Sequence, residues 1–164
     1  MDKLRTCFFT GHRKLANNKI DIIREKLAKN IENLIIKYDV KNFIAGGAIG
    51  FDTMAAEAVI EMRKKYPHIK LILYIPCYGQ SNKWTDNQKY KYRIILSKAD
   101  EVIYVTEKEY SEECMQLRNM KMIRDSSFCI AFCLLSNSGT GLTLRNAEAV
   151  GIDIINIADE IYEN

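Results

Sequence analysis

Short apolar runs alternate along the chain with longer segments in which apolar residues recur every three or four positions. The clearest periodic segment is 20–38, whose apolar side chains would line one face of an amphipathic helix. Runs of about four to eight apolar residues are typical of strands. The pattern predicts strands at 6–11, 42–47, 70–76, 101–106, 128–135 and 153–157, and helices at 20–38, 52–66, 87–99, 112–125 and from the 136–141 turn to 150, with a short helix after the last strand.

This alternation of strands and helices predicts an α/β fold, a doubly wound and mostly parallel sheet of about six strands with helices on both faces. No repeat, linker or low-complexity segment divides the sequence, so we expect residues 1–164 to form a single domain. In such sheets ligands bind beyond the carboxyl ends of the strands, near the point where the strand order reverses. The loops that directly follow the strands are therefore the places to look for function.

Composition and charge narrow the class of protein. Apolar residues make up 48% of the 164 residues and charged residues 27%, which is ordinary globular usage. The formal net charge of +3 is too small to indicate a nucleic-acid binder, and we do not expect nucleic acid as the partner. No window offers the ~18 uncharged apolar residues of a membrane helix. Residues 1–14 lack the apolar core of a secretory signal, so we expect a soluble cytoplasmic protein.

The five cysteines are widely spaced and include no C-x-x-C pair. With only two histidines in the chain, no metal site is predicted. We interpret the cysteines as reduced, buried small hydrophobes. Cys77 is the best candidate for a reactive thiol because it lies in a predicted loop.

Two glycine-rich turns each stand between a predicted strand and a predicted helix, "GGAIGFDT" after the second strand and "SNSGTG" after the fifth. Such turns expose backbone N–H groups at the positive end of a helix dipole, a geometry that binds phosphate. The spacing matches neither the dinucleotide nor the P-loop motif. Together the two turns predict a shared crevice for an anionic ligand. Asp52 would repel a phosphate, and it is interpreted either as a helix N-cap or as an acceptor for ribose hydroxyls.

Other loops add polar and aromatic candidates. Thr10, His12 and Arg13 follow the first strand, and the planar guanidinium of an arginine suits phosphate. Trp84 lies in a segment where basic and aromatic residues interleave, which fits either a solvated helix face or the stacking of bases. Arg118 and Asn119 would reach the strand ends if their helix leans inward. The candidate ligand-binding residues are Thr10, Gly11, His12, Arg13, Gly46, Gly47, Gly50, Asp52, Trp84, Arg118, Ser138, Gly139, Thr140 and Gly141.

The motifs "TGHR", "GGAIGFDTMAAEAV", "RNMKMIRDSS" and "SGTG", in this order and with the lone tryptophan between them, resemble the SLOG superfamily. That superfamily includes the DNA-processing protein DprA and the "lonely guy" phosphoribohydrolases that release cytokinins. The chain looks most similar to the YpsA-like branch of small bacterial proteins. The resemblance implies a Rossmann-like fold that binds a nucleotide or a derivative such as AMP, NAD or ADP-ribose. It also implies a phosphate site at Gly46, Gly47, Gly50, Gly139 and Thr140, with Thr10 and Arg13 beside it.

The chain departs from the phosphoribohydrolases at their catalytic glutamate. Their motif P-G-G-x-G-T-x-x-E corresponds here to "SNSGTGLTLRNAE", in which the third residue after Thr143 is Asn146 and the third after Thr140 is Thr143. Whether any reaction is catalysed is therefore left open, with Asp52, His12 and Glu148 as weak acid–base candidates.

Three functions follow as hypotheses, and the cofactor is unknown. The first is a sensor or regulatory module that binds a nucleotide-derived ligand. The second is an N-glycosidase that acts on nucleoside monophosphates. The third is single-stranded nucleic-acid binding. The sequence does not decide whether the chain also binds a protein partner or forms a homo-oligomer. The residues that the third hypothesis would use are Lys83, Trp84, Lys89, Lys91 and Arg93.

Overall fold

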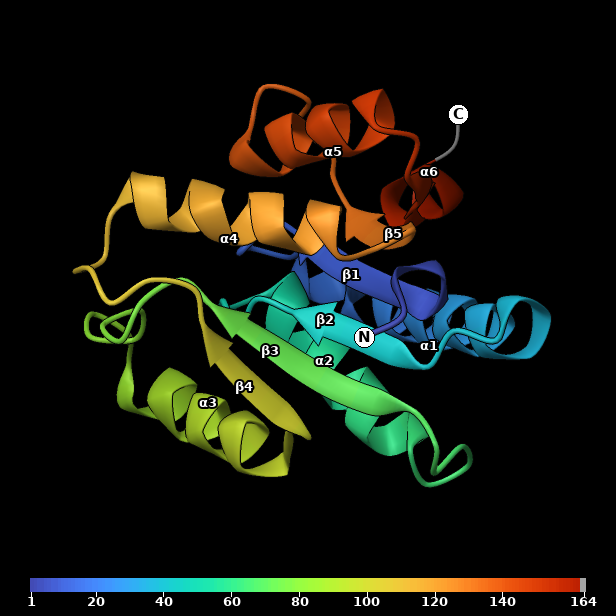
Figure 1. Ribbon diagram of the computed structural model, residues 1–164, viewed down its shortest axis with the longest axis horizontal. Helices are drawn as coiled ribbons and strands as arrows, with labels where there is room; N and C mark the ends of the chain where they lie inside the picture. The colour runs from blue at the N-terminus through green and yellow to red at the C-terminus, as the bar shows by residue number, and fades with distance from the viewer. Residues whose placement is uncertain (163–164) are drawn as a thin grey trace.

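The computed structural model describes residues 1–162 and contains one six-stranded sheet, in which every neighbouring pair of strands is parallel (Figure 1). The strand order is β4-β3-β2-β1-β5-β6. The order reverses between β1 and β5, which makes their carboxyl ends the expected place for a crevice. The strands are β1 (Thr6–Gly11), β2 (Asn42–Ala45), β3 (Lys70–Ile75), β4 (Glu101–Tyr104), β5 (Phe128–Phe132) and β6 (Asp153–Asn156).

Helices cover both faces of the sheet, which confirms the predicted Rossmann-like, doubly wound fold (Figure 1). Four helices pack on one face around a large apolar cluster, and α4 and α5 pack on the other around a smaller one. Among residues 1–162, none of the helices combines the length and the apolar character needed to cross a bilayer. The helices are α1 (Ile20–Tyr38), α2 (Phe51–Met62), α3 (Asp86–Lys98), α4 (Glu112–Arg124), α5 (Gly139–Ala149) and α6 (Ile157–Ile161).

The strands are buried because apolar side chains leave them on both faces. Phe9 and Phe43 stack with ring centroids 6.0 Å apart on the face covered by α1 and α2. Phe8 and Ile44, their neighbours along the same strands, face α4 and α5. All four side chains are fully buried or nearly so, as expected for a parallel sheet between two helical layers.

The structure corrects the predicted end of the fifth strand. The apolar run was expected to continue to 135, but β5 ends at Phe132. Leu134 and Leu135 are 49% and 60% exposed, and their N–H groups point to the His12 ring instead of a strand partner. The last apolar residues of the run therefore belong to the loop between β5 and α5.

Candidate functional site

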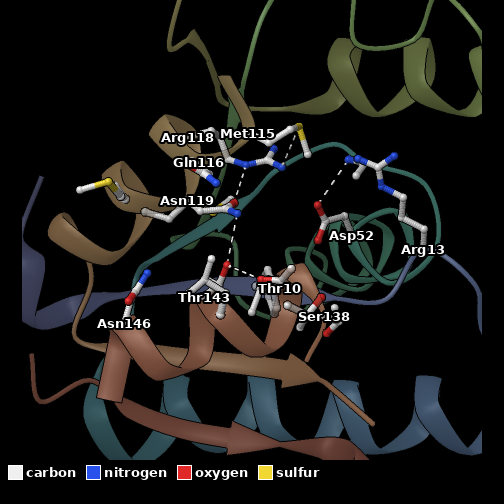
Figure 2. A pocket seen from close by; sticks show the side chains of 18 of the residues that line it. Thr10, Arg13, Asp52, Met115, Gln116, Arg118, Asn119, Ser138, Thr143 and Asn146 are labelled. Atoms are coloured by element: carbon white, nitrogen blue, oxygen red, sulfur yellow. Dashed lines mark hydrogen bonds between the residues drawn. The ribbon is translucent and has the colours of Figure 1, made fainter. Parts of the chain in front are cut away.

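A cavity of about 560 Å³ lies at the carboxyl ends of β1 and β5, the point where the strand order reverses (Figure 2). Its walls come from the loop after β1, the start of α2, one face of α4 and the first turns of α5. The size is within the range of small-molecule sites. Predicted residues that line it are Thr10, Gly11, His12, Arg13, Asp52, Arg118, Ser138, Gly139 and Thr140, whereas Gly46, Gly47, Gly50, Trp84 and Gly141 do not line it.

The amino end of α5 opens into this cavity. Ser138 is the N-cap residue, and its hydroxyl oxygen accepts a hydrogen bond from the Gly141 N–H at 3.1 Å. Gly139 and Thr140 occupy the first turn, where N–H groups have no partner within the helix. A Cβ placed on Gly139 would meet no atom within 4 Å. The first turn of α5, at the positive end of the helix dipole, thus lines the cavity with open space beside Gly139.

The glycine turn after β2 serves a different purpose. A Cβ on Gly46 would lie 2.2 Å from Nη1 of Arg118, so the guanidinium occupies the space that a side chain at position 46 would need. Nη1 donates to the carbonyl oxygens of Gly46 at 2.7 Å and Tyr74 at 3.2 Å. Arg118 is 3% exposed, and burial lowers its pKa. The guanidinium, which lines the cavity, is thus held by backbone carbonyls at the carboxyl ends of β2 and β3.

Gly50 holds the loop after β1 against α2. Its φ of 82° lies in the left-handed region that favours glycine, and a Cβ there would lie 2.3 Å from the carbonyl oxygen of Arg13. The Phe51 N–H donates to the carbonyl of His12 at 3.1 Å. This close approach directs the exposed Arg13 side chain toward the cavity rim, where Nη2 donates to the Tyr110 hydroxyl at 3.1 Å.

Asp52 is a buried carboxyl group in the first turn of α2, 6% exposed (Figure 2). The N-cap prediction is wrong, because Gly50 is the N-cap and the carboxylate instead accepts from the Ala48 N–H at 3.3 Å. Burial raises the pKa of Asp52 to about 6, although the charges of Arg118 and Arg13 oppose this shift. The group therefore changes its protonation state near neutral pH, which is a property of acid–base residues.

His12 links two loops. Its Nε2 accepts hydrogen bonds from the Leu134 N–H at 2.8 Å and the Leu135 N–H at 3.3 Å. Both bonds require the neutral ring, and desolvation also lowers the pKa of His12. The lone pair that a general base would use is therefore already occupied. Glu148, the other weak candidate, is exposed on α5 and does not line the cavity.

The far end of the cavity carries amide side chains, of which the sequence analysis singled out only Asn119 as a residue that could reach the strand ends (Figure 2). Asn119 donates from Nδ2 to the Thr143 hydroxyl at 3.2 Å, which ties α4 to α5. Gln116 and Asn146 line the same space from these two helices. The i, i+3 spacing of Gln116 with Asn119, and of Thr143 with Asn146, was the available signal, because it places each pair on one helix face.

Aromatic residues form a second group outside the cavity. Trp84 packs edge-on against Tyr92 at 5.1 Å, and the Tyr92 hydroxyl accepts from Nε2 of Gln80 at 3.4 Å. Tyr78 follows β3 and Tyr104 ends β4, and their rings stack with centroids 4.4 Å apart. The two residues are 65% and 38% exposed. Sequence reasoning missed this exposed pair because its members are distant in the chain.

Comparisons with known proteins agree with the predicted resemblance. Residues 7–140 match the model of the YspA SLOG family. The SPbeta prophage-derived protein YoqJ of Bacillus subtilis (strain 168) is 38% identical over 137 residues, covering 77% of this chain and 80% of YoqJ. A UPF0398 protein of Bacillus cereus (strain B4264) is 36% identical over 89 residues, covering 54% of this chain and 48% of the relative. The chain thus matches about half the length of the UPF0398 protein.

Two solved structures of DNA processing protein A (DprA) share the fold. The Streptococcus pneumoniae protein superimposes with a TM-score of 0.62 at 19% identity, covering 93% of this chain and 50% of that chain. The Helicobacter pylori protein, whose structure describes a single-stranded DNA binding mode, gives a TM-score of 0.63 at 20% identity, with 93% and 65% covered. At these identities the likeness establishes the fold.

These neighbours overturn one expectation. From the net charge of +3 we did not expect nucleic acid as the partner, but a protein of the same fold binds single-stranded DNA. The expectation was wrong because net charge averages over the whole surface, whereas nucleic acids are bound by local groups of basic and aromatic side chains.

Proposed function

The chain belongs to the YspA SLOG family, and we propose that it binds a nucleotide in the cavity between α4 and α5, as a sensor or regulatory module. The observation that carries the proposal is the open first turn of α5. There Gly139 and Thr140, whose N–H groups have no partner within the helix, line the cavity, and Arg13 supplies a cation at its rim. Backbone donors, a helix dipole and a guanidinium together favour a phosphate group.

The rest of the cavity suits a sugar and a base. Gln116 and Asn146 offer amide donors and acceptors, and Met120 adds an apolar surface at the same end. Amide groups of this kind can hydrogen-bond to the edge of a base. A phosphate on α5 would thus leave the space along α4 for the nucleoside.

Asp52 fits the ribose better than the phosphate in this arrangement. Its pKa of about 6 keeps the carboxyl mostly ionised at pH 7, so it would repel a phosphate but accept hydrogen bonds from sugar hydroxyls. The occupied His12 lone pair favours binding over N-glycosidic cleavage, since it removes one of the three acid–base candidates.

Ligand-induced stabilisation tests the proposal. AMP, NAD, ADP-ribose and inorganic phosphate are each added, and the melting temperature is recorded; a ligand at ~100 times its Kd adds about 2.7 kcal/mol. Arg13→Gln should weaken binding of a phosphate-bearing ligand about tenfold, because one charge-assisted contact is lost. Lys14→Gln removes the same charge one residue away, outside the cavity lining, and should bind normally. Equal affinities for the two variants would contradict the proposed phosphate site.

Single-stranded nucleic-acid binding is the second candidate, and the exposed Tyr78–Tyr104 stack favours it. Stacking a base on an aromatic side chain contributes about 1–3 kcal/mol. Tyr78→Ala should therefore weaken binding of a labelled oligothymidylate at least about fivefold, and binding should fall steeply with salt. Tyr38→Ala, an exposed tyrosine at the end of α1, is the matched control. An affinity unchanged by Tyr78→Ala would exclude the stack from the contact.

A further inference from the structure

Two fully buried cysteines meet at the carboxyl edge of the sheet, outside the cavity lining. β3 and β4 pair in register at Ile75 and Tyr104, and the Val105 N–H donates to the Ile75 carbonyl at 2.8 Å. Two residues further on, Cys77 and Thr106 therefore follow neighbouring parallel strands, which run ~4.8 Å apart. The Thr106 hydroxyl lies 3.5 Å from Sγ of Cys114.

The position of α4 agrees with this neighbourhood. Arg118 donates to the Tyr74 carbonyl, so the second turn of α4 lies over the end of β3. Cys114 is one turn earlier, on the same face of this helix. Cys114 is also among the groups that raise the pKa of the Cys77 thiol, which agrees with the neighbourhood given by the strand register.

The Cys114 sulfur lies among hydrogen-bonding groups, and as a thiol it donates to the Glu109 carbonyl oxygen at 3.2 Å. Cys114 is the third residue of α4, near the positive end of the helix dipole, and the Ser111 hydroxyl donates to its Sγ at 3.2 Å. Hydrogen bonds from Ser111 and Thr106 lower the pKa of Cys114, and the charge of Lys108 acts in the same direction. Burial raises the pKa of the Cys77 thiol. Of the two thiols, Cys114 is thus the one that ionises more readily.

We propose that Cys114 and Cys77 form an oxidisable dithiol pair, with a small hydroperoxide as the oxidant. The Cys114 thiolate attacks one peroxide oxygen, the O–O bond breaks, and an alcohol or water leaves, which gives a sulfenic acid at Cys114. The Cys77 sulfur then attacks the Cys114 sulfur, the S–O bond breaks, and water leaves with the thiol proton. Two thiols are oxidised to one disulfide, and the hydroperoxide is reduced by two electrons.

The cross-link would act on the wall of the cavity. It joins the end of β3 to the first turn of α4 and so closes the irregular segment between β4 and α4, which carries Tyr110. Met115 and Gln116, the residues directly after Cys114, line the cavity. Oxidation would therefore restrict the side of the cavity that includes the Tyr110–Arg13 contact. The dithiol chemistry itself does not depend on which ligand the cavity binds.

Peptide mapping after peroxide treatment tests the proposal. Trypsin places Cys77 in peptide 71–83 and Cys114 in peptide 109–118. Treatment of the folded protein with hydrogen peroxide should join these two peptides, lower their summed mass by two hydrogens, and leave three of the five thiols reactive after denaturation. Dithiothreitol should restore both peptides.

Variants separate the two sulfur atoms. Cys114→Ser should abolish the cross-linked peptide, and Cys77→Ser should leave a sulfenic acid at Cys114 that dimedone traps. Cys133→Ser removes a half-buried thiol elsewhere and should leave the cross-link unchanged. Two outcomes would overturn the proposal. One is peroxide treatment that oxidises Cys133 while peptides 71–83 and 109–118 stay separate. The other is dimedone labelling of Cys77 in Cys114→Ser together with no labelling of Cys114 in Cys77→Ser.

Discussion

The two glycine-rich turns look alike in sequence, since each lies between a strand and a helix, but they differ in what fills the space beside them. The turn after β2 is filled by the protein itself, with the Arg118 guanidinium against Gly46 and the Arg13 backbone against Gly50. The turn before α5 leaves Gly139 facing open space in the cavity wall. A glycine turn at a strand end thus indicates close approach by some group, and only the contacts reveal whether that group is internal.

The largest expected effect concerns the filled turn. Gly46→Ala forces the Arg118 guanidinium to move, which breaks its bonds to two buried carbonyl oxygens and separates it from Asp52. Disrupting a buried, hydrogen-bonded charge costs about 3–5 kcal/mol. Urea unfolding measures the loss. Gly139→Ala is the control, because its methyl group meets no atom and should change stability by less than about 1 kcal/mol. Equal stability of the two variants would remove the distinction between the turns.

The second effect is the pH dependence that Asp52 gives to stability. Its folded pKa of about 6 lies above its ordinary value of 3.8, so the folded state binds more protons between these values. Its contribution is therefore greatest below pH 3.8 and is lost as pH rises through 6, by about 2–3 kcal/mol. Asp52→Asn should flatten the stability profile across this window in urea unfolding. A profile as steep as that of the original protein would show that another group titrates there.

A third effect sharpens the comparison on the open turn. If the first turn of α5 contacts a phosphate, the methyl group of Gly139→Ala enters that space and should weaken ligand binding about tenfold, which is ~1.4 kcal/mol. Calorimetric titration with the best ligand from the thermal screen measures this. Gly151→Ala cannot serve as the control because its φ is 85°, so Lys14→Gln is used again. Unchanged affinity in Gly139→Ala would place the phosphate elsewhere.

The smallest effect concerns the His12 link between the two loops. The folded pKa of His12 is lowered, so its contribution to stability is present above its ordinary pKa of 6.5 and is lost as pH falls toward the folded value. His12→Asn should lower the free energy of unfolding by about 1 kcal/mol at pH 7.5, because the shorter side chain loses the hydrogen bonds that Nε2 accepts. It should also reduce the loss of stability as the pH falls. His68→Asn controls for the loss of one imidazole. If the stability of His12→Asn fell with pH as much as that of the original protein, His12 would not be the group that couples pH to the contact between the two loops.

Much of the fold could be predicted because its signals are local. The period of 20–38 predicts α1 with both of its ends, and Ser111 predicts the start of α4 through its N-cap. The open turn of α5 was also found, since its donors belong to consecutive residues. The guanidinium beside Gly46 comes from a residue 72 positions away, and the acceptor for Leu134 from one 122 positions away. Such contacts depend on strand order and helix placement, which one sequence does not specify.

The guanidinium above Gly46 also links two positions in the evolution of the fold. The volume at 46 and the length of the side chain at 118 share one space, so neither can grow unless the other shrinks. A relative with a side chain at the position of Gly46 should therefore carry a shorter residue at the position of Arg118. In this protein a shortened residue at 118 should act as a suppressor of Gly46→Ala, recovering its folded yield although the same shortening alone is harmful.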